Sequence, residues 1–200
     1  MVLVFGVLLY VLQHRRLRGF FAYLGLTRAP WSSIRLAAVW GLVSVSIGIA
    51  LSEGLLPLVL GDASAAWRES PNTTGNQLIA TGAKGATLMI AALLKGGVQT
   101  ALVEELLFRG IVAKRLIGRL GFRTGNVLQA FIFLSIHVML FVAFAREHWI
   151  SLTLILGPFP FVLGLLAGWL NHQARGSILP GWVLHGLANA LTYLWAVSLR

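Results

Sequence analysis

The chain has no cysteine and very few acidic residues. Its 200 residues include six Asp and Glu against sixteen Lys and Arg, and charged residues make up only 11% of the total. The absence of cysteine excludes disulfides, thiolate metal sites and a cysteine nucleophile. Any catalytic chemistry must therefore use carboxylate, histidine and hydroxyl groups.

Apolar sequence dominates instead. Hydrophobic residues make up 58% of the chain and the mean hydropathy is +0.83, with uncharged runs that are long enough to cross a bilayer. This composition predicts an all-α polytopic transmembrane helical bundle, with residues 1–200 as a single integral membrane domain. The net charge of +10 does not indicate nucleic acid, because the basic residues lie between apolar runs, where loop charge fixes membrane orientation.

We expect about six spans, with a break near Gly96 and Gly97 in the third and a kink at Pro158 and Pro160 in the fifth. The expected ranges are 1–12, 36–60, 77–120, 127–145, 149–171 and 177–199. Basic loops alternate with loops of balanced charge. This pattern predicts that the basic loops are cytoplasmic and that the N-terminus lies outside.

Two of the six acids are adjacent in the apolar stretch V-E-E-L-L-F-R-G, at Glu104 and Glu105. On a helix Glu105 and Arg109 are four residues apart and can form an ion pair, whereas Glu104 points elsewhere. The spacing therefore predicts a structural pair of Glu105 with Arg109 and leaves Glu104 available as a general base. The alternative is that both glutamates pair with Arg109 and only hold helices together.

Two other spans also carry polar groups. His137 follows Phe133 by one helical turn, and His185 and Asn189 share one face of the last predicted helix. Each could be ordinary interhelical hydrogen bonding, but polar groups on three separate spans predict a shared site.

The inventory of this site suits amide hydrolysis. A carboxylate with a histidine can activate water, while a second histidine and an asparagine amide can donate hydrogen bonds to a developing oxyanion. This interpretation requires no cofactor. Glu104, His137 and His185 also match the two-histidine, one-glutamate ligand set of catalytic zinc, and the residues alone do not choose between water and metal.

Three segments resemble, in order, the EExxxR, FxxxH and HxxxN motifs of the CPBP family, which comprises type II CAAX prenyl endopeptidases and their bacteriocin-processing, abortive-infection relatives. The segments are E-E-L-L-F-R-G from Glu104, F-L-S-I-H from Phe133 and H-G-L-A-N from His185. The resemblance covers about residues 98–194. It implies an intramembrane endopeptidase in the cytoplasmic membrane of a prokaryote, with a site that opens toward the cytoplasmic side.

The resemblance also implies roles for the residues. Glu104 and His137 would activate water, His185 and Asn189 would form the oxyanion site, and Glu105 with Arg109 would be structural. Zinc stays an alternative, because family members were long called metalloproteases.

The implied partners are the lipid bilayer and a peptide or protein substrate, either prenylated or a bacteriocin precursor, and not nucleic acid. Two other functions stay open. One is a non-proteolytic bacteriocin immunity or membrane scaffold protein, and the other is a transporter in which Glu104 and the histidines relay protons.

Overall fold

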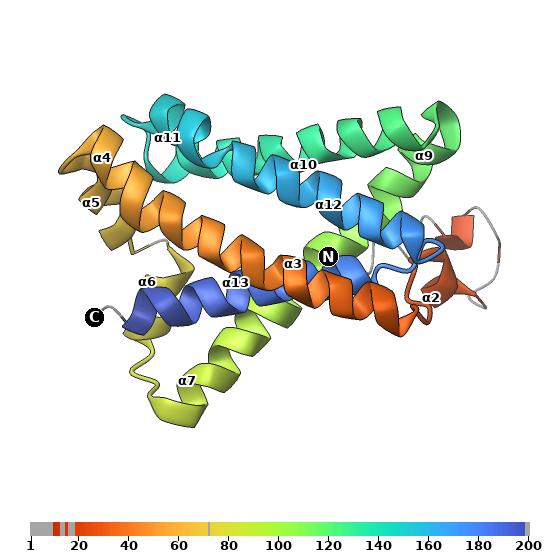
Figure 1. Ribbon diagram of the computed structural model, residues 1–200, viewed down its shortest axis with the longest axis horizontal. Helices are drawn as coiled ribbons and strands as arrows, with labels where there is room; N and C mark the ends of the chain where they lie inside the picture. The colour runs from red at the N-terminus through yellow and green to blue at the C-terminus, as the bar shows by residue number, and fades with distance from the viewer. Residues whose placement is uncertain (1–9, 13–14, 16–18, 72, 199–200) are drawn as a thin grey trace.

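The computed structural model describes residues 10–12, 15, 19–71 and 73–198. Within them every regular element is a helix, which confirms the predicted all-α class (Figure 1). The elements are α2 (Phe20–Tyr23), α3 (Trp31–Ile49), η1 (Ala50–Leu55), α4 (Leu56–Leu60), α5 (Ala63–Glu69), α6 (Thr74–Ala80), α7 (Gly85–Ala92), η2 (Leu93–Leu102), α8 (Val103–Glu105), η3 (Leu106–Ala113), α9 (Lys114–Leu120), α10 (Phe122–Phe144), α11 (Trp149–Leu156), α12 (Pro158–Gln173) and α13 (Leu179–Ser198).

Three helices are long and apolar enough to cross a membrane: Trp31–Leu60, Gly85–Leu120 and Phe122–Phe144. α11 and α12 pass the same test together as a pair bent by 41°, and the bend falls at Pro158, where the sequence predicts a kink. The protein is therefore an integral membrane protein with three or four candidate spans in its described part, fewer than the six expected.

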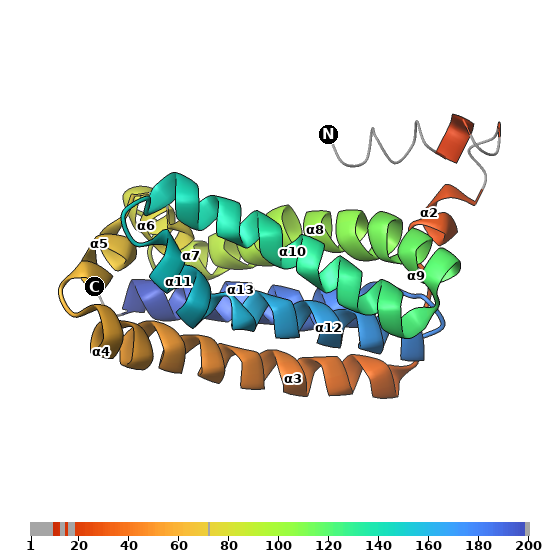
Figure 2. The ribbon, with the colours of Figure 1, turned by 90° about the horizontal axis from the view of Figure 1, so that it is seen from above.

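The two other expected spans differ in their outcome. The first, at 1–12, lies mostly outside the described residues. The last corresponds to α13, which has 20 residues but is too polar to count as a span by composition. It packs against α3, η2, α12 and α6 and lies inside the bundle (Figure 2). A helix surrounded by other helices can carry polar side chains that lipid would exclude.

Small residues fill the helix contacts, and large apolar side chains face outward. The buried face of α3 is a stripe of small residues: Ser33, Ala37, Gly41 and Ser44. A Cβ added at Gly41 would lie 3.0 Å from the Cβ of Leu187 on α13. In contrast, Leu58 is 83% exposed and Leu154 is 73% exposed. Membrane helices pack in this way, with small residues between helices and large apolar ones against lipid.

The helix that bears both glutamates runs without a break from Gly85 to Leu120, so the predicted interruption at Gly96 and Gly97 is wrong. Its backbone instead widens into two π-helical stretches, η2 and η3, on either side of α8. Gly96 serves close packing, because a Cβ there would lie 2.8 Å from the backbone nitrogen of Ala190. At 1.5 Å per residue the helix is about 54 Å long, and it crosses the bundle obliquely (Figure 1).

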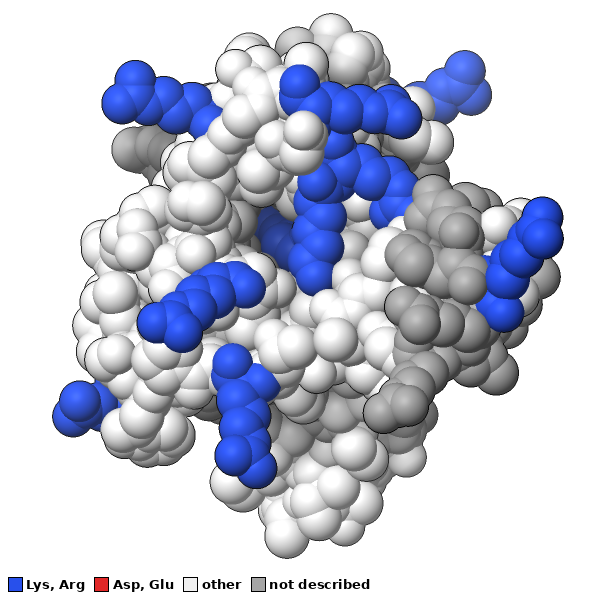
Figure 3. Space-filling model, turned by 90° about the vertical axis from the view of Figure 1, so that its right-hand side faces the viewer, with Lys and Arg blue, Asp and Glu red and all other residues white. Residues whose placement is uncertain are grey.

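One end of the bundle is basic. Figure 3 views this end and shows Lys and Arg but no Asp or Glu among the described residues there. The loops and helix ends on this side carry Arg28, Arg35, Lys114, Arg115, Arg119, Arg123 and Arg175. The acids outside the central pair lie at the opposite end, beside α4, α5 and α11 (Figure 1); they are Glu53, Asp62, Glu69 and Glu147.

Candidate active site

Glu105 and Arg109 form the ion pair that their spacing predicts. Arg109 Nη1 lies 3.0 Å from Glu105 Oε1, and the two side chains are 2% and 0% exposed. The guanidinium also lies over the ring of Phe133, with 4.4 Å between its central carbon and the ring centroid. A cation in this position is attracted to the ring face. The charge of Arg109 is thus compensated inside the bundle.

Glu105 has two further partners, which join α12 and α13 to α8. His185 Nδ1 lies 3.3 Å from Glu105 Oε1, and Asn171 Nδ2 donates to Oε2 at 3.5 Å. Asn171 Oδ1 in turn accepts from the backbone nitrogen of Gly181 at 2.8 Å. A Cβ at Gly181 would lie 2.6 Å from Glu105 Oε2, so only glycine leaves room for this carboxylate.

Glu104 has a different environment, as the helical spacing predicts. Its side chain is 29% exposed, and its Oε2 lies 3.6 Å from His185 Nε2. This oxygen is itself buried and has no hydrogen-bond partner in the described part of the chain. His185 therefore lies between the two carboxylates, with one ring nitrogen facing each. Arg109 forms its ion pair with Glu105, which argues against the alternative that both glutamates pair with Arg109.

Phe133 is fully buried and contacts both site histidines. The centroid of its ring lies 4.7 Å from that of His137 and 5.6 Å from that of His185. His137 Nδ1 lies 2.9 Å from the Phe133 carbonyl oxygen. Because a carbonyl can only accept, Nδ1 carries the proton, and Nε2 of the neutral ring is free to accept one. No hydrogen bond or ion pair between described residues joins His137 to Glu104, so the predicted pairing is not direct here.

Asn189 lies one turn after His185 on α13, where it is partly buried. Its side chain makes no hydrogen bond to a described residue, and nothing brings it against Glu104. One turn further along the same face is Tyr193, beside the side chains of Thr74 and Thr100. The sequence analysis missed Tyr193, although its spacing continues the line of the two predicted residues.

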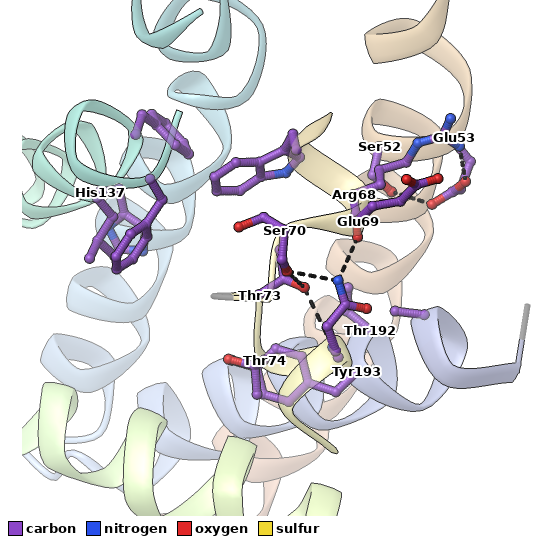
Figure 4. A pocket seen from close by; sticks show the side chains of 17 residues that line it. Ser52, Glu53, Arg68, Glu69, Ser70, Thr73, Thr74, His137, Thr192 and Tyr193 are labelled. Atoms are coloured by element: carbon purple, nitrogen blue, oxygen red, sulfur yellow. Dashed lines mark hydrogen bonds and ion pairs between the residues drawn. The ribbon is translucent and has the colours of Figure 1, made fainter. Parts of the chain in front are cut away.

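A cavity of about 770 Å³ lies next to His137 and is enclosed by α5, α6, α10 and α13 (Figure 4). Tyr193 also lines it. The cavity is at the end of the bundle away from the basic surface (Figure 1). It therefore connects the second-motif histidine with the end of the molecule opposite the basic surface.

The residues proposed as zinc ligands do not form a metal site in this arrangement. Among the described residues no three His, Asp or Glu side chains are grouped closely enough to hold a metal ion. Glu104 and His185 are neighbours, whereas His137 is not with them. The donor set therefore does not fit a zinc ion here.

Together the fold and site define a class: a helical membrane protein with a buried centre made of two carboxylates, an arginine and a histidine. Comparison with known families agrees. The family model described as type II CAAX prenyl endopeptidase Rce1-like matches residues 85–191, which is more than half of the chain and includes every predicted site residue. The chain belongs to this family, whose members are hydrolases. No curated protein and no solved structure is significantly similar to it.

Proposed function

We propose that this protein is an intramembrane endopeptidase in which Glu104 activates the attacking water. The observation that carries the proposal is the state of Glu104 Oε2, a buried carboxylate oxygen with no hydrogen-bond partner among the described residues and with an imidazole 3.6 Å away. A general base needs a free acceptor of this kind within reach of its proton donor. Glu105 is saturated by its own partners and cannot serve.

Charge balance supports a shared proton at this centre. The charges of Glu105 and Arg109 cancel, and a low-dielectric interior disfavours any further net charge. Glu104 and His185 are then neutral together if they hold one proton in addition to the N–H of the neutral imidazole, either on the carboxylate or as an imidazolium. Glu104 can act as the base in the second form, in which its carboxylate is ionised. Such a pair can take a proton from water and return it in a later step.

The proposed reaction follows from these groups. Glu104 removes a proton from water, and the resulting hydroxide forms a bond to the carbonyl carbon of the peptide. His185 and Asn189 donate hydrogen bonds to the oxyanion, as the family resemblance implies. The C–N bond then breaks as the proton passes from Glu104 to the leaving nitrogen. His137, whose Nε2 can accept a proton, assists Glu104 in activating the water from the cavity side, as the family resemblance implies.

The deciding experiment uses purified full-length protein in lipid nanodiscs and a library of peptides that includes prenylated and bacteriocin-precursor sequences. We expect the wild type to cleave some of these peptides. The Glu104→Gln variant should cleave none, although it unfolds at the same temperature as the wild type. Glu147→Gln, in an exposed turn, is the control and keeps activity. Cleavage by the folded Glu104→Gln variant would refute the mechanism, and a folded wild type that cleaves nothing would favour the scaffold function.

Sidedness is part of the proposal. Basic loops at the cytoplasmic face would follow the usual charge rule. The cavity beside His137 would then open on the opposite side, whereas the family resemblance implies a site open to the cytoplasm. If substrate enters through this cavity, the basic loops and the entrance cannot both face the cytoplasm. Labelling of cysteines at the two ends from each side of the membrane decides which of them does.

A further inference from the structure

The walls of the cavity come from three parts of the chain, of which one is Thr192, Tyr193 and Ala196 on α13. His137 and its neighbours on α10 belong to the segment that matches the family, but the facing wall is built by residues that precede it, which are Ser52, Glu53, 67–70 and 73–76. This wall is a formed structure: Asn76 Nδ2 donates to the carbonyl oxygens of Arg68 at 2.9 Å and Ser70 at 2.8 Å. We call residues 63–80, which comprise α5 and α6, the cap.

The cavity has one aromatic side. Trp67 of the cap meets Phe141 of α10 edge to face, with ring centroids 5.4 Å apart, and Leu140 and Phe144 extend the same surface. Pockets lined by aromatic side chains with a few polar groups bind ligands through a buried apolar group. This side therefore suits a large apolar side chain.

The remaining lining is polar and slightly acidic. Thr73, Thr74 and Thr192 line this part. The hydroxyl of Thr73 donates to the Ser70 carbonyl oxygen at 3.1 Å and accepts from the backbone nitrogen of Asn76 at 3.4 Å, and that of Thr74 bonds to Tyr193. Thr192 therefore supplies the hydroxyl that can bond to a backbone amide of an extended peptide. The lining holds the carboxylates of Glu53 and Glu69 against the single guanidinium of Arg68. An acidic ligand is disfavoured by this balance, and a neutral or basic peptide is not.

From this arrangement we propose that the cap is the specificity wall of the enzyme. The cavity binds the substrate residues next to the scissile bond as an extended, non-acidic peptide, with one large apolar side chain held against the aromatic surface that Trp67, Phe141 and Phe144 form. The inference rests on the proposed function, because His137 joins the cavity to the reaction centre. Recognition is thereby shared between α10, inside the family match, and the cap, which precedes it.

The first test compares peptides that differ only in the residue beside the scissile bond, Phe or Ala. We expect Trp67→Ala to lower the ratio of kcat/KM for the Phe peptide over the Ala peptide by at least about 10-fold. The kcat/KM for the Ala peptide, which has no large side chain to place against the wall, should fall less than that for the Phe peptide. Trp31→Ala is the matched control, since Trp31 is 69% exposed at the start of α3, and it keeps the wild-type ratio.

Two further measurements protect the test from misfolding, because Trp67 also packs against the core. Leu140 lines the cavity but is 42% exposed, so Leu140→Ala folds more easily and should shift the ratio in the same direction. The second measurement uses the absence of cysteine. In a Glu104→Gln background the Phe peptide should slow maleimide labelling of Glu69→Cys in the cavity and leave labelling of Gly118→Cys at the basic end unchanged.

The outcomes separate the two proposals. Unchanged ratios in folded Trp67→Ala and Leu140→Ala would overturn the assignment of the cap while leaving the endopeptidase intact. A wild type that cleaves no peptide would remove the proposed function. In that case slower labelling of Glu69→Cys in the presence of the Phe peptide would still support the cavity as a peptide-binding site. Unchanged labelling would overturn the peptide-binding site as well.

Discussion

Neutralising Glu105 alone should destabilise the protein far more than neutralising Glu105 and Arg109 together. Both side chains are at most 2% exposed, so either charge left alone has no water to solvate it. Removing one partner of a buried pair costs about 3–5 kcal/mol, whereas replacing both by uncharged residues of similar volume is often neutral. A cycle of Glu105→Gln, Arg109→Met and the double variant therefore predicts a coupling free energy close to the sum of the two single costs, about 6–10 kcal/mol.

The two single variants should also differ from each other. After Arg109→Met, the Glu105 carboxylate still faces His185 at 3.3 Å and Asn171 at 3.5 Å, so the cost lies near the lower limit. After Glu105→Gln, the Arg109 guanidinium keeps aromatic contacts such as the Phe133 ring, which do not replace a carboxylate, and the cost lies near the upper limit.

Reversible unfolding by sodium dodecyl sulfate in mixed micelles, followed by the fluorescence of the seven tryptophans, measures these free energies. The exposed pair of Arg68 with Glu53, whose side chains are 36% and 29% exposed, is the control, and Glu53→Gln should cost less than about 1 kcal/mol. Additive effects of Glu105→Gln and Arg109→Met within about 0.5 kcal/mol would refute the reasoning.

Three other predictions concern packing, metal and sidedness. Gly181→Ala places a Cβ 2.6 Å from Glu105 Oε2 and 2.7 Å from Asn171 Nδ2 and should destabilise by about 1–3 kcal/mol. Gly118→Ala, with no atom within 4 Å, should instead stabilise by about 0.5–1 kcal/mol, and equal effects in thermal unfolding would contradict this contrast. Peptide cleavage should survive a chelator, and a loss that added zinc restores would reverse the proposal of a metal-independent reaction. In sealed vesicles an impermeant maleimide should label Glu69→Cys and Gly118→Cys from opposite faces of the membrane. Labelling of both from one face would contradict the placement of the cavity and the basic surface on opposite sides.

Local geometry explains what could be predicted of the site. The pairing of Glu105 with Arg109 and the different direction of Glu104 follow from residue spacing on one helix, which needs no knowledge of the fold. The contact of His185 with both carboxylates depends instead on how α13 packs against α8. Asn171 was missed for the same reason, because nothing in its local sequence distinguishes it from any polar residue at a helix end.

The expected spans show a similar limit. Long uncharged runs predicted the helices around 36–60 and 127–145 because a lipid-facing helix must be apolar over most of its surface. α13 differs, since its neighbours are helices and its polar face is covered by them. The glycines at 96 and 97 predicted a break, but Gly96 is a point of close approach to Ala190. The sequence alone does not distinguish a glycine that allows close packing from one that allows a turn.

The proposed reaction uses residues of the family segment, whereas the proposed recognition also uses residues that precede it. The groups proposed for catalysis lie within residues 85–191, the segment shared with the family, and their arrangement depends on a few buried contacts that tolerate little change. The cap and Tyr193 lie outside that segment and line the cavity together with residues of it. Substitutions in the cap can therefore alter which peptide is held without disturbing Glu104 and its neighbours. Family membership alone consequently predicts the reaction better than the substrate. The side chains of the cap that line the cavity are the ones to vary in a search for the substrate of this protein.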